Sequence, residues 1–168
     1  MPIDMISPLP RPFSVADLPE DGLGVTVEAT PEEREALARA LKLPAIHALT
    51  GAFRVSGTRR RVHVSGRVDA RVNRICVVSL DPFDSDIRED VEVDFAASSA
   101  SGEAPRPGDD PPDEIVNGTV DLGALTAEFL VLGLDPHPRK PGVDFSFETA
   151  DDSSGSPFAA LEKLRRDE

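Results

Sequence analysis

A strict two-residue alternation over residues 61–72 constrains this chain more than any other feature of its sequence. Even positions carry small or apolar side chains, and odd positions carry polar or charged ones. Successive side chains of a β-strand point to opposite faces, so the pattern predicts a strand with one face on a core. The core side is Val62, Val64, Gly66, Val68, Ala70 and Val72, and the other side is Arg61, His63, Ser65, Arg67, Asp69 and Arg71.

Neighbouring segments predict an antiparallel meander around this strand. Residues 46–56 read as a strand that turns at Ser56-Gly57-Thr58, and residues 86–95 alternate between apolar and mostly acidic side chains. Residues 75–80 are almost continuously apolar, which predicts a strand buried on both faces. Asn73-Arg74 interrupts the alternation, so we expect a bulge or bend there.

Two helices should cover the apolar face. The first spans 31–42, where Thr30 and Glu33 form a capping box around Pro31. The second spans 121–134, with Asp121 as its cap. Its apolar stripe is Leu122, Leu125, Phe129 and Leu132. The predicted fold class is therefore α+β, an antiparallel sheet of about five strands with two main helices on one face.

We expect residues 1–168 to form a single domain with two disordered segments. Residues 97–112 are small, polar and proline-rich, and residues 148–157 have a similar character. A last short helix is expected after Ser156-Pro157. Short strands are also expected around residues 25–27 and 114–116.

The net charge of −13 is unevenly distributed. Residues 54–74 hold seven arginines and one acid, whereas residues 75–158 hold nineteen acids and four bases. The acidic whole should repel phosphate backbones and favours a basic partner. A single cysteine cannot form an internal disulfide, and we expect neither a signal peptide nor a membrane span, so we expect a cytoplasmic protein.

The arginines have two interpretations. They could bind RNA phosphates, although no Tyr or Trp accompanies them. Alternatively, the acidic outer side of 86–95 could pair with them across the sheet, at roughly 0.2–1 kcal/mol per pair. The candidate contact residues are Arg59, Arg60, Arg61, Arg67, Arg71 and Arg74, with Arg139 and Lys140 near the end of the second helix.

Cys76 could be a nucleophile only if a base such as His47, His63 or His137 lay within hydrogen-bond reach. A cysteine in an apolar strand is otherwise an inert core residue. The sequence contains no nucleotide-binding glycine loop and too few thiols and histidines for a zinc site. We therefore expect no catalysis, no cofactor, no metal and no small-molecule substrate, with a cysteine hydrolase as the alternative.

Three segments occur in a recognisable order: the run from Cys76 to Phe83, the helix start at Val120 followed by residues 134–142, and the tail 156–164. Together they resemble the bacterial YceD family, the large ribosomal RNA subunit accumulation proteins, in its alphaproteobacterial variant. The motif residues include Cys76, Leu80, Asp81, Pro82, Phe83, Asp121, Leu122, Pro136 and Pro138.

The resemblance implies a ribosome biogenesis factor for accumulation or maturation of large-subunit (23S) ribosomal RNA, with no known catalytic activity. Its partner would be ribosomal RNA, a basic large-subunit ribosomal protein or an assembly intermediate. Many members carry Cys-x-x-Cys where this chain has Cys76 and Ser79, with further cysteines near Arg139 and Lys140. The missing thiols argue against a metal here.

Overall fold

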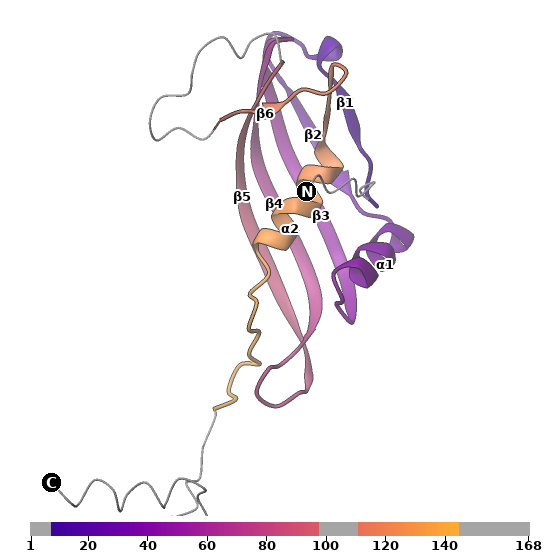
Figure 1. The fold of residues 1–168 in the computed structure, drawn as a ribbon, viewed down its shortest axis with the longest axis vertical. Coiled ribbons are helices and arrows are strands. Elements are labelled where there is room, and N and C mark those ends of the chain that lie inside the picture. Colours follow the sequence, from indigo (N-terminus) through magenta and orange to yellow (C-terminus); the bar gives the residue numbers. More distant parts are fainter. Residues whose placement is uncertain (1–7, 98–110, 145–168) are drawn as a thin grey trace, which may run out of the picture.

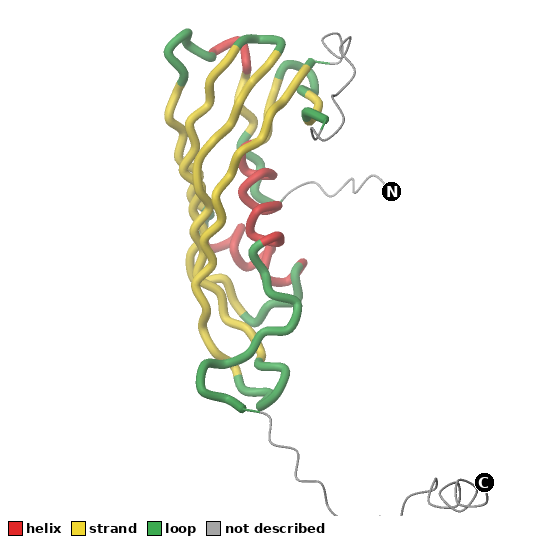
Figure 2. Tube along the Cα trace, turned by 90° about the vertical axis from the view of Figure 1, so that its left-hand side faces the viewer, coloured by secondary structure: helices red, strands yellow, loops and turns green. Residues whose placement is uncertain are grey.

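The structure, a computed structural model, describes residues 8–97 and 111–144. Five strands form one sheet in the order β2-β3-β4-β5-β6, with the helices on one of its faces (Figures 1 and 2). The strands are β2 (Leu23–Glu28), β3 (Ala45–Gly57), β4 (Arg61–Ile75), β5 (Pro82–Ala96) and β6 (Asp113–Glu114), and the helices are α1 (Pro31–Ala40) and α2 (Leu122–Leu132). This arrangement confirms the predicted α+β class.

The three central strands are long and antiparallel. Strand β4 pairs with β3 through most of its length and with β5 from end to end, Arg61 opposite Ala96 and Ile75 opposite Pro82. β6 is parallel to the end of β5. A second, two-stranded sheet pairs β1 (Pro12–Ser14) with β7 (Thr119–Asp121), and a short 3-10 turn, η1 (Val15–Asp17), follows β1.

Both helices begin at the predicted caps. The Thr30 hydroxyl accepts the Glu33 amide, and the Glu33 carboxylate accepts the Thr30 amide, completing the capping box of α1. At α2, Asp121 Oδ1 accepts the amides of Gly123 and Ala124 at 2.9 and 3.0 Å. The same oxygen accepts the Arg11 amide at 2.9 Å, so this cap also fastens the N-terminal segment to α2.

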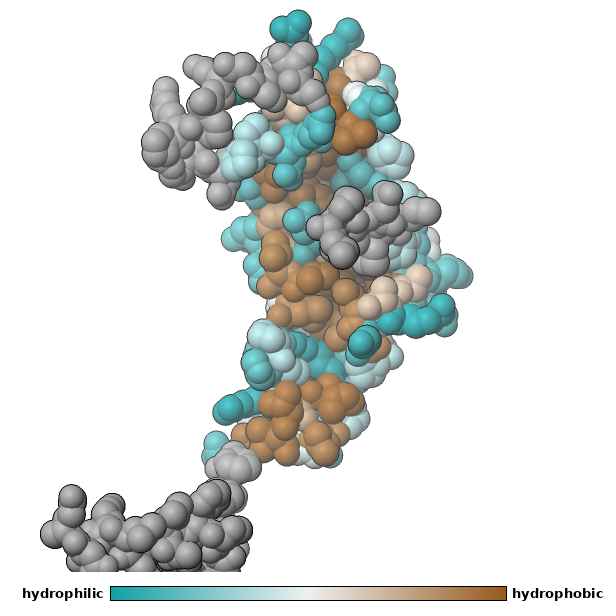
Figure 3. Space-filling view, viewed as in Figure 1, coloured by the Kyte–Doolittle hydropathy of each residue, from teal (hydrophilic) through white to brown (hydrophobic). Residues whose placement is uncertain are grey.

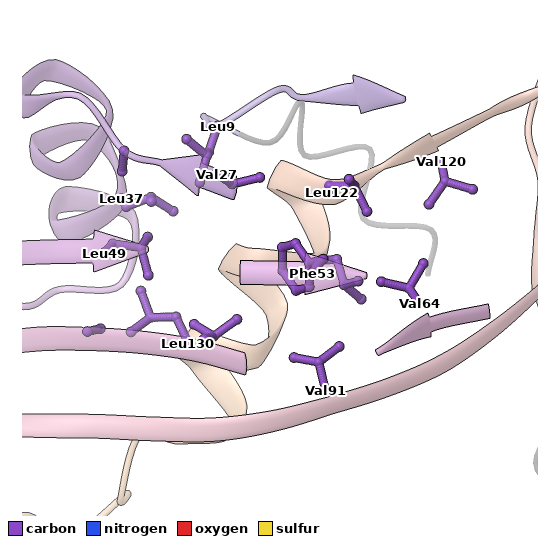
Figure 4. Packing of buried hydrophobic residues seen from close by; sticks show 14 of the residues in the cluster. Leu9, Val27, Leu37, Leu49, Phe53, Val64, Val91, Val120, Leu122 and Leu130 are labelled. Atoms are coloured by element: carbon purple, nitrogen blue, oxygen red, sulfur yellow. The ribbon is translucent and has the colours of Figure 1, made fainter. Parts of the chain in front are cut away.

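The core lies between the sheet and the helices (Figure 4). The valines of β4 are 0–1% exposed, as the alternation predicts. Leu49, Phe53 and Val55 of β3 lie beside them on the same face. From the helix side, Leu122, Leu125 and Leu130 of α2 and Leu37 of α1 are buried in this cluster.

Three local predictions are wrong. The bulge lies in β3, where the register shifts between Ile46 and Ala48, and β4 runs regularly through Asn73-Arg74. Residues 76–81 form the turn between β4 and β5 instead of a buried strand, and Leu80 is 74% exposed with φ +60°. Leu132 does not belong to the buried face of α2 and is 66% exposed. That face includes Leu122, Leu125, Thr126 and Leu130.

The predicted disordered segment 97–112 lies mostly outside the described residues, and 148–157 and the helix expected after Ser156 lie entirely outside them. At the end of the first segment, Pro111 and Pro112 lead directly into β6, and Ala97 donates its amide to the Arg60 carbonyl.

Helix α2 approaches the N-terminal segment closely at Gly123. An Ala Cβ at this position would lie 1.8 Å from the Leu9 carbonyl oxygen, so the packing must shift. Gly to Ala in a free helix stabilises it by about 1 kcal/mol. Here we expect Gly123→Ala to lower the free energy of unfolding by about 1–3 kcal/mol because of this overpacking, measured by urea denaturation.

Gly24→Ala is the matched control, because a Cβ there meets nothing within 4 Å. We expect its unfolding midpoint to stay near that of the unsubstituted protein. A Gly123→Ala protein at least as stable as the parent would contradict this packing of α2.

Candidate functional site

The face of the sheet opposite the helices carries a ladder of charged pairs between β4 and β5. Arg67 lies opposite Asp90, and their Nε and Oδ1 atoms are 3.0 Å apart. Asp69 lies opposite Arg88 at 2.8 Å, and this pairing raises the pKa of Arg88. His63 Nδ1 lies 2.8 Å from Asp94 Oδ1. The cross-strand pairing predicted from the sequence is therefore present.

The ladder continues to the other end of the strands around Asp84. This carboxylate accepts a hydrogen bond from Asn73 at 2.8 Å and lies 3.1 Å from His47 Nε2. These two contacts, with Asn73 the larger cause, hold the pKa of Asp84 below its usual value. Arg71 lies 3.6 Å from Asp84 and 3.8 Å from Asp86. Arg67 and Arg71 are thus neutralised locally.

The turn between β3 and β4 carries Arg59, Arg60 and Arg61, which we call the arginine tip. The Thr58 hydroxyl accepts the amides of Arg60 and Arg61, which fixes the turn. All three arginines are exposed, and within the described part of the chain their side chains make no ion pair. The tip therefore presents cationic side chains that are accessible to an anion.

The remaining predicted basic residues do not join this tip. Arg74 is only 8% exposed and lies on the core side of the sheet, where it donates a hydrogen bond to the Asp135 carbonyl. This candidate contact residue is therefore buried and lies apart from the exposed arginines. Arg139 and Lys140 lie near the β4–β5 turn, a strand length of roughly 45 Å from the tip.

The β4–β5 turn is joined to the segment that follows α2. The Val77 amide donates to the Pro138 carbonyl at 2.9 Å, and the Lys140 amide donates to Cys76 Sγ at 3.4 Å. Lys140 Nζ also lies 3.6 Å from Asp81. Two segments more than 60 residues apart thus form one end of the molecule. The exposed apolar side chains at this end belong to Ile75, Val77 and Leu80, and a brown area lies at the lower end of the described chain in Figure 3.

Cys76 is fully buried in this turn, and its sulfur accepts amide hydrogen bonds from Ser79 and Lys140. These bonds, with that from Lys140 the largest cause, lower the pKa of the thiol from 9.0 to about 6. No imidazole is among its hydrogen-bond partners in the described chain. His47 and His63 contact Asp84 and Asp94 on the opposite face.

Other motif residues have structural positions. Asp121 and Leu122 start α2, with Leu122 in the core. Phe83 is half-buried on the core side of β5, opposite Arg74, and Pro82 begins that strand. Pro136 and Pro138 follow α2, which ends earlier, with Gly133 as its C-cap. Leu80 extends the exposed apolar surface of Ile75 and Val77.

Two further observations concern metal ligands and membrane-spanning helices. Among the described residues, no group of three or more His, Cys, Asp or Glu side chains is placed to hold a metal ion. None of the described helices is long and apolar enough to cross a membrane.

The model of the family described as "Large ribosomal RNA subunit accumulation protein YceD" matches residues 64–165. The chain belongs to the YceD family. The match begins within β4 and includes the β4–β5 turn, β5 and α2. Searches of curated proteins and of solved structures found no match.

Sequence reasoning for this YceD chain does not reveal the contact between the β4–β5 turn and residues 138–140. That contact uses backbone amides and carbonyls, which every sequence offers. The family motifs mark both segments in the sequence. Their order does not show that the two segments touch.

The acidity of Cys76 can be tested directly. Thiolate absorbance at 240 nm, titrated with pH in the folded protein, should show a midpoint near pH 6. Ser79→Ala removes the side-chain contribution to that lowered pKa, so its midpoint should move upward.

Cys76→Ala supplies the background absorbance for this titration. A midpoint near the ordinary thiol value in the folded parent protein would contradict the hydrogen bonds assigned to the sulfur.

Proposed function

We propose that this protein supports the accumulation of large-subunit ribosomal RNA in the cytoplasm as a non-enzymatic binding factor. The observation that carries the proposal is the family match over residues 64–165. The matched region contains the β4–β5 turn and the segment after α2, which contact each other at one end of the molecule.

A basic protein of the large subunit, or an assembly intermediate that exposes one, is the partner favoured by charge. The net charge is −13, and Arg67 and Arg71 of β4 are paired with acids of β5. A phosphate backbone approaching the outer face would meet arginines already paired with acids, and at Glu92 an acid that forms no ion pair with a described residue. A cationic protein segment would meet no such repulsion.

The arginine tip supports a smaller, secondary contact with ribosomal RNA. Its three side chains are exposed, and none of them forms an ion pair with a described residue. Three cations at the end of a hairpin suit a phosphate contact without base recognition. The surface therefore combines one RNA-facing end with a protein-facing acidic side.

The alternative of a cysteine hydrolase has little support. Cys76 has an acidic thiol, but its sulfur is buried and is satisfied by backbone amides. A general base needs to reach the nucleophile, and the imidazoles of His47 and His63 bond to carboxylates on the other face of the sheet.

Affinity capture of the tagged protein from cells tests the proposal. We expect large-subunit ribosomal proteins to remain bound after RNase treatment, and ribosomal RNA to be captured in its absence. Loss of every ribosomal protein after RNase would contradict the protein-partner part of the proposal.

Two charge variants separate the tip from the ladder. Arg59→Gln, Arg60→Gln and Arg61→Gln together should reduce captured RNA and lower the salt slope of RNA binding by up to about one unit for each phosphate that is no longer bound. Arg67→Gln with Arg71→Gln is the control that leaves the tip intact. Its stability should fall by no more than about 1 kcal/mol per exposed pair. Equal RNA loss in both variants would contradict the assignment to the tip.

A further inference from the structure

Strand β5 has an open edge along most of its length. One side pairs with β4 from Pro82 to Ala96, whereas the other pairs with β6 only at Phe95 and Ala96. Figure 1 shows β5 as the outermost of the long strands, with β6 near its upper end. Among the described residues, no strand pairs with this edge from Pro82 to Asp94.

The hydrogen bonds at the ends of β5 show which of its backbone groups face that edge. Cys76 donates to the Asp81 carbonyl and Ala97 donates to the Arg60 carbonyl, so odd-numbered residues of β5 bond to β4. Even-numbered residues face away, as the Ala96 carbonyl does when it accepts the Ile115 amide. Pro82, which has no N–H, is an even-numbered residue and fits this direction.

The side chains on the two faces of this edge differ in character, because the core face is mainly apolar, with Glu89 as its one charged residue. The outward-bonding residues place exposed, mainly acidic side chains on the outer face, with Arg88 the one cation. On the core face, Phe83, Val93 and Phe95 are only half-buried, so an added strand could cover them. The outer-face acids are Asp84, Asp86, Asp90, Glu92 and Asp94.

We propose that the open edge of β5 binds an extended, basic segment of a partner protein as an added antiparallel strand. Main-chain hydrogen bonds to the even-numbered residues would supply the pairing, as in β-strand addition generally. The segment would alternate Lys or Arg, beside the outer-face acids, with apolar residues beside Phe83, Val93 and Phe95. The inference rests on the proposed function only for the source of that segment in ribosome assembly.

The same features exclude other occupants. A second copy presenting its own β5 edge would bring acids against acids, which is destabilising across a sheet and is a common protection of edges. A nucleic acid offers no peptide ladder and would be repelled by these carboxylates. The charged pairs between β4 and β5 leave one acid free to bind a cation. Glu92 lies opposite Ser65 and forms no ion pair with a described residue.

A labelled twelve-residue peptide that alternates lysine with valine or threonine is the probe, with affinity measured by fluorescence anisotropy. In an antiparallel ladder, the residues that bond to the even positions of β5 share their outer face, so they are the lysines. N-methylation of the lysine amides should therefore weaken binding at least about tenfold. N-methylation of the valine and threonine amides should leave it nearly unchanged. Equal effects of the two methylations overturn the proposal.

Two proline variants test the same edge from the protein side. Glu92→Pro removes one outward N–H and one acid, and Thr26→Pro removes an outward N–H from the β2 edge of the same sheet. We expect about tenfold weaker peptide binding for Glu92→Pro and unchanged binding for Thr26→Pro. Equal binding by both folded variants overturns the proposal.

A measurement on the unsubstituted protein makes the test independent of variant folding. The peptide should slow amide hydrogen exchange at Asp86, Arg88, Asp90 and Glu92 and leave Thr26 unchanged. Absence of peptide binding, or no slowing at these amides, overturns the edge proposal whatever the ribosomal role. Normal large-subunit RNA in cells lacking the protein overturns the proposed function and leaves the edge result standing.

Discussion

The pairing of β4 with both neighbouring strands is the interaction on which the rest of the structure depends. Val62, Val64, Val68 and Val72 lie on one face and are 0–1% exposed. Burying each of these side chains stabilises the fold by about 1.5–3 kcal/mol. A one-residue slip would put all four into solvent, so the register of the central sheet is strongly specified.

This fixed register also determines the charge pattern of the opposite face. Because β5 pairs with β4 residue by residue, Arg67 and Arg71 lie opposite Asp90 and Asp86, and Asp69 lies opposite Arg88. Exposed pairs of this kind contribute little stability, roughly 0.2–1 kcal/mol each. Their larger effect is to neutralise Arg67 and Arg71 while the tip arginines keep their full charge. The distribution of free charge therefore follows from strand pairing, and the local sequence alone does not reveal it.

Features that depend on neighbouring residues could be predicted from the sequence, whereas features that depend on distant segments could not. The alternation in β4 and the caps of both helices depend on residues within one turn or strand, and all are confirmed. Residues 75–80 have the nearly continuous apolar side chains of a buried strand, but the conformation of 76–81 depends on the left-handed backbone of Leu80 and on bonds from a distant segment. Arg74 is an even-numbered residue of β4, so the alternation places it on the core side of the sheet. Its charge would suggest an exposed position instead. The carbonyl of Asp135, which accepts its hydrogen bond, is brought there by the chain leaving α2.

The cap of α2 connects the core to the end of the molecule where the β4–β5 turn meets residues 138–140. Asp121 fixes where α2 begins and holds Arg11 beside it, so the helix and the N-terminal segment are placed together. The length of α2 then determines where Pro138 and Lys140 reach the β4–β5 turn. Motif residues that are far apart along the chain are therefore positioned by one helix. Its cap fixes where the helix begins, its buried face fixes how the helix lies on the sheet, and its end fixes where the following segment meets the β4–β5 turn.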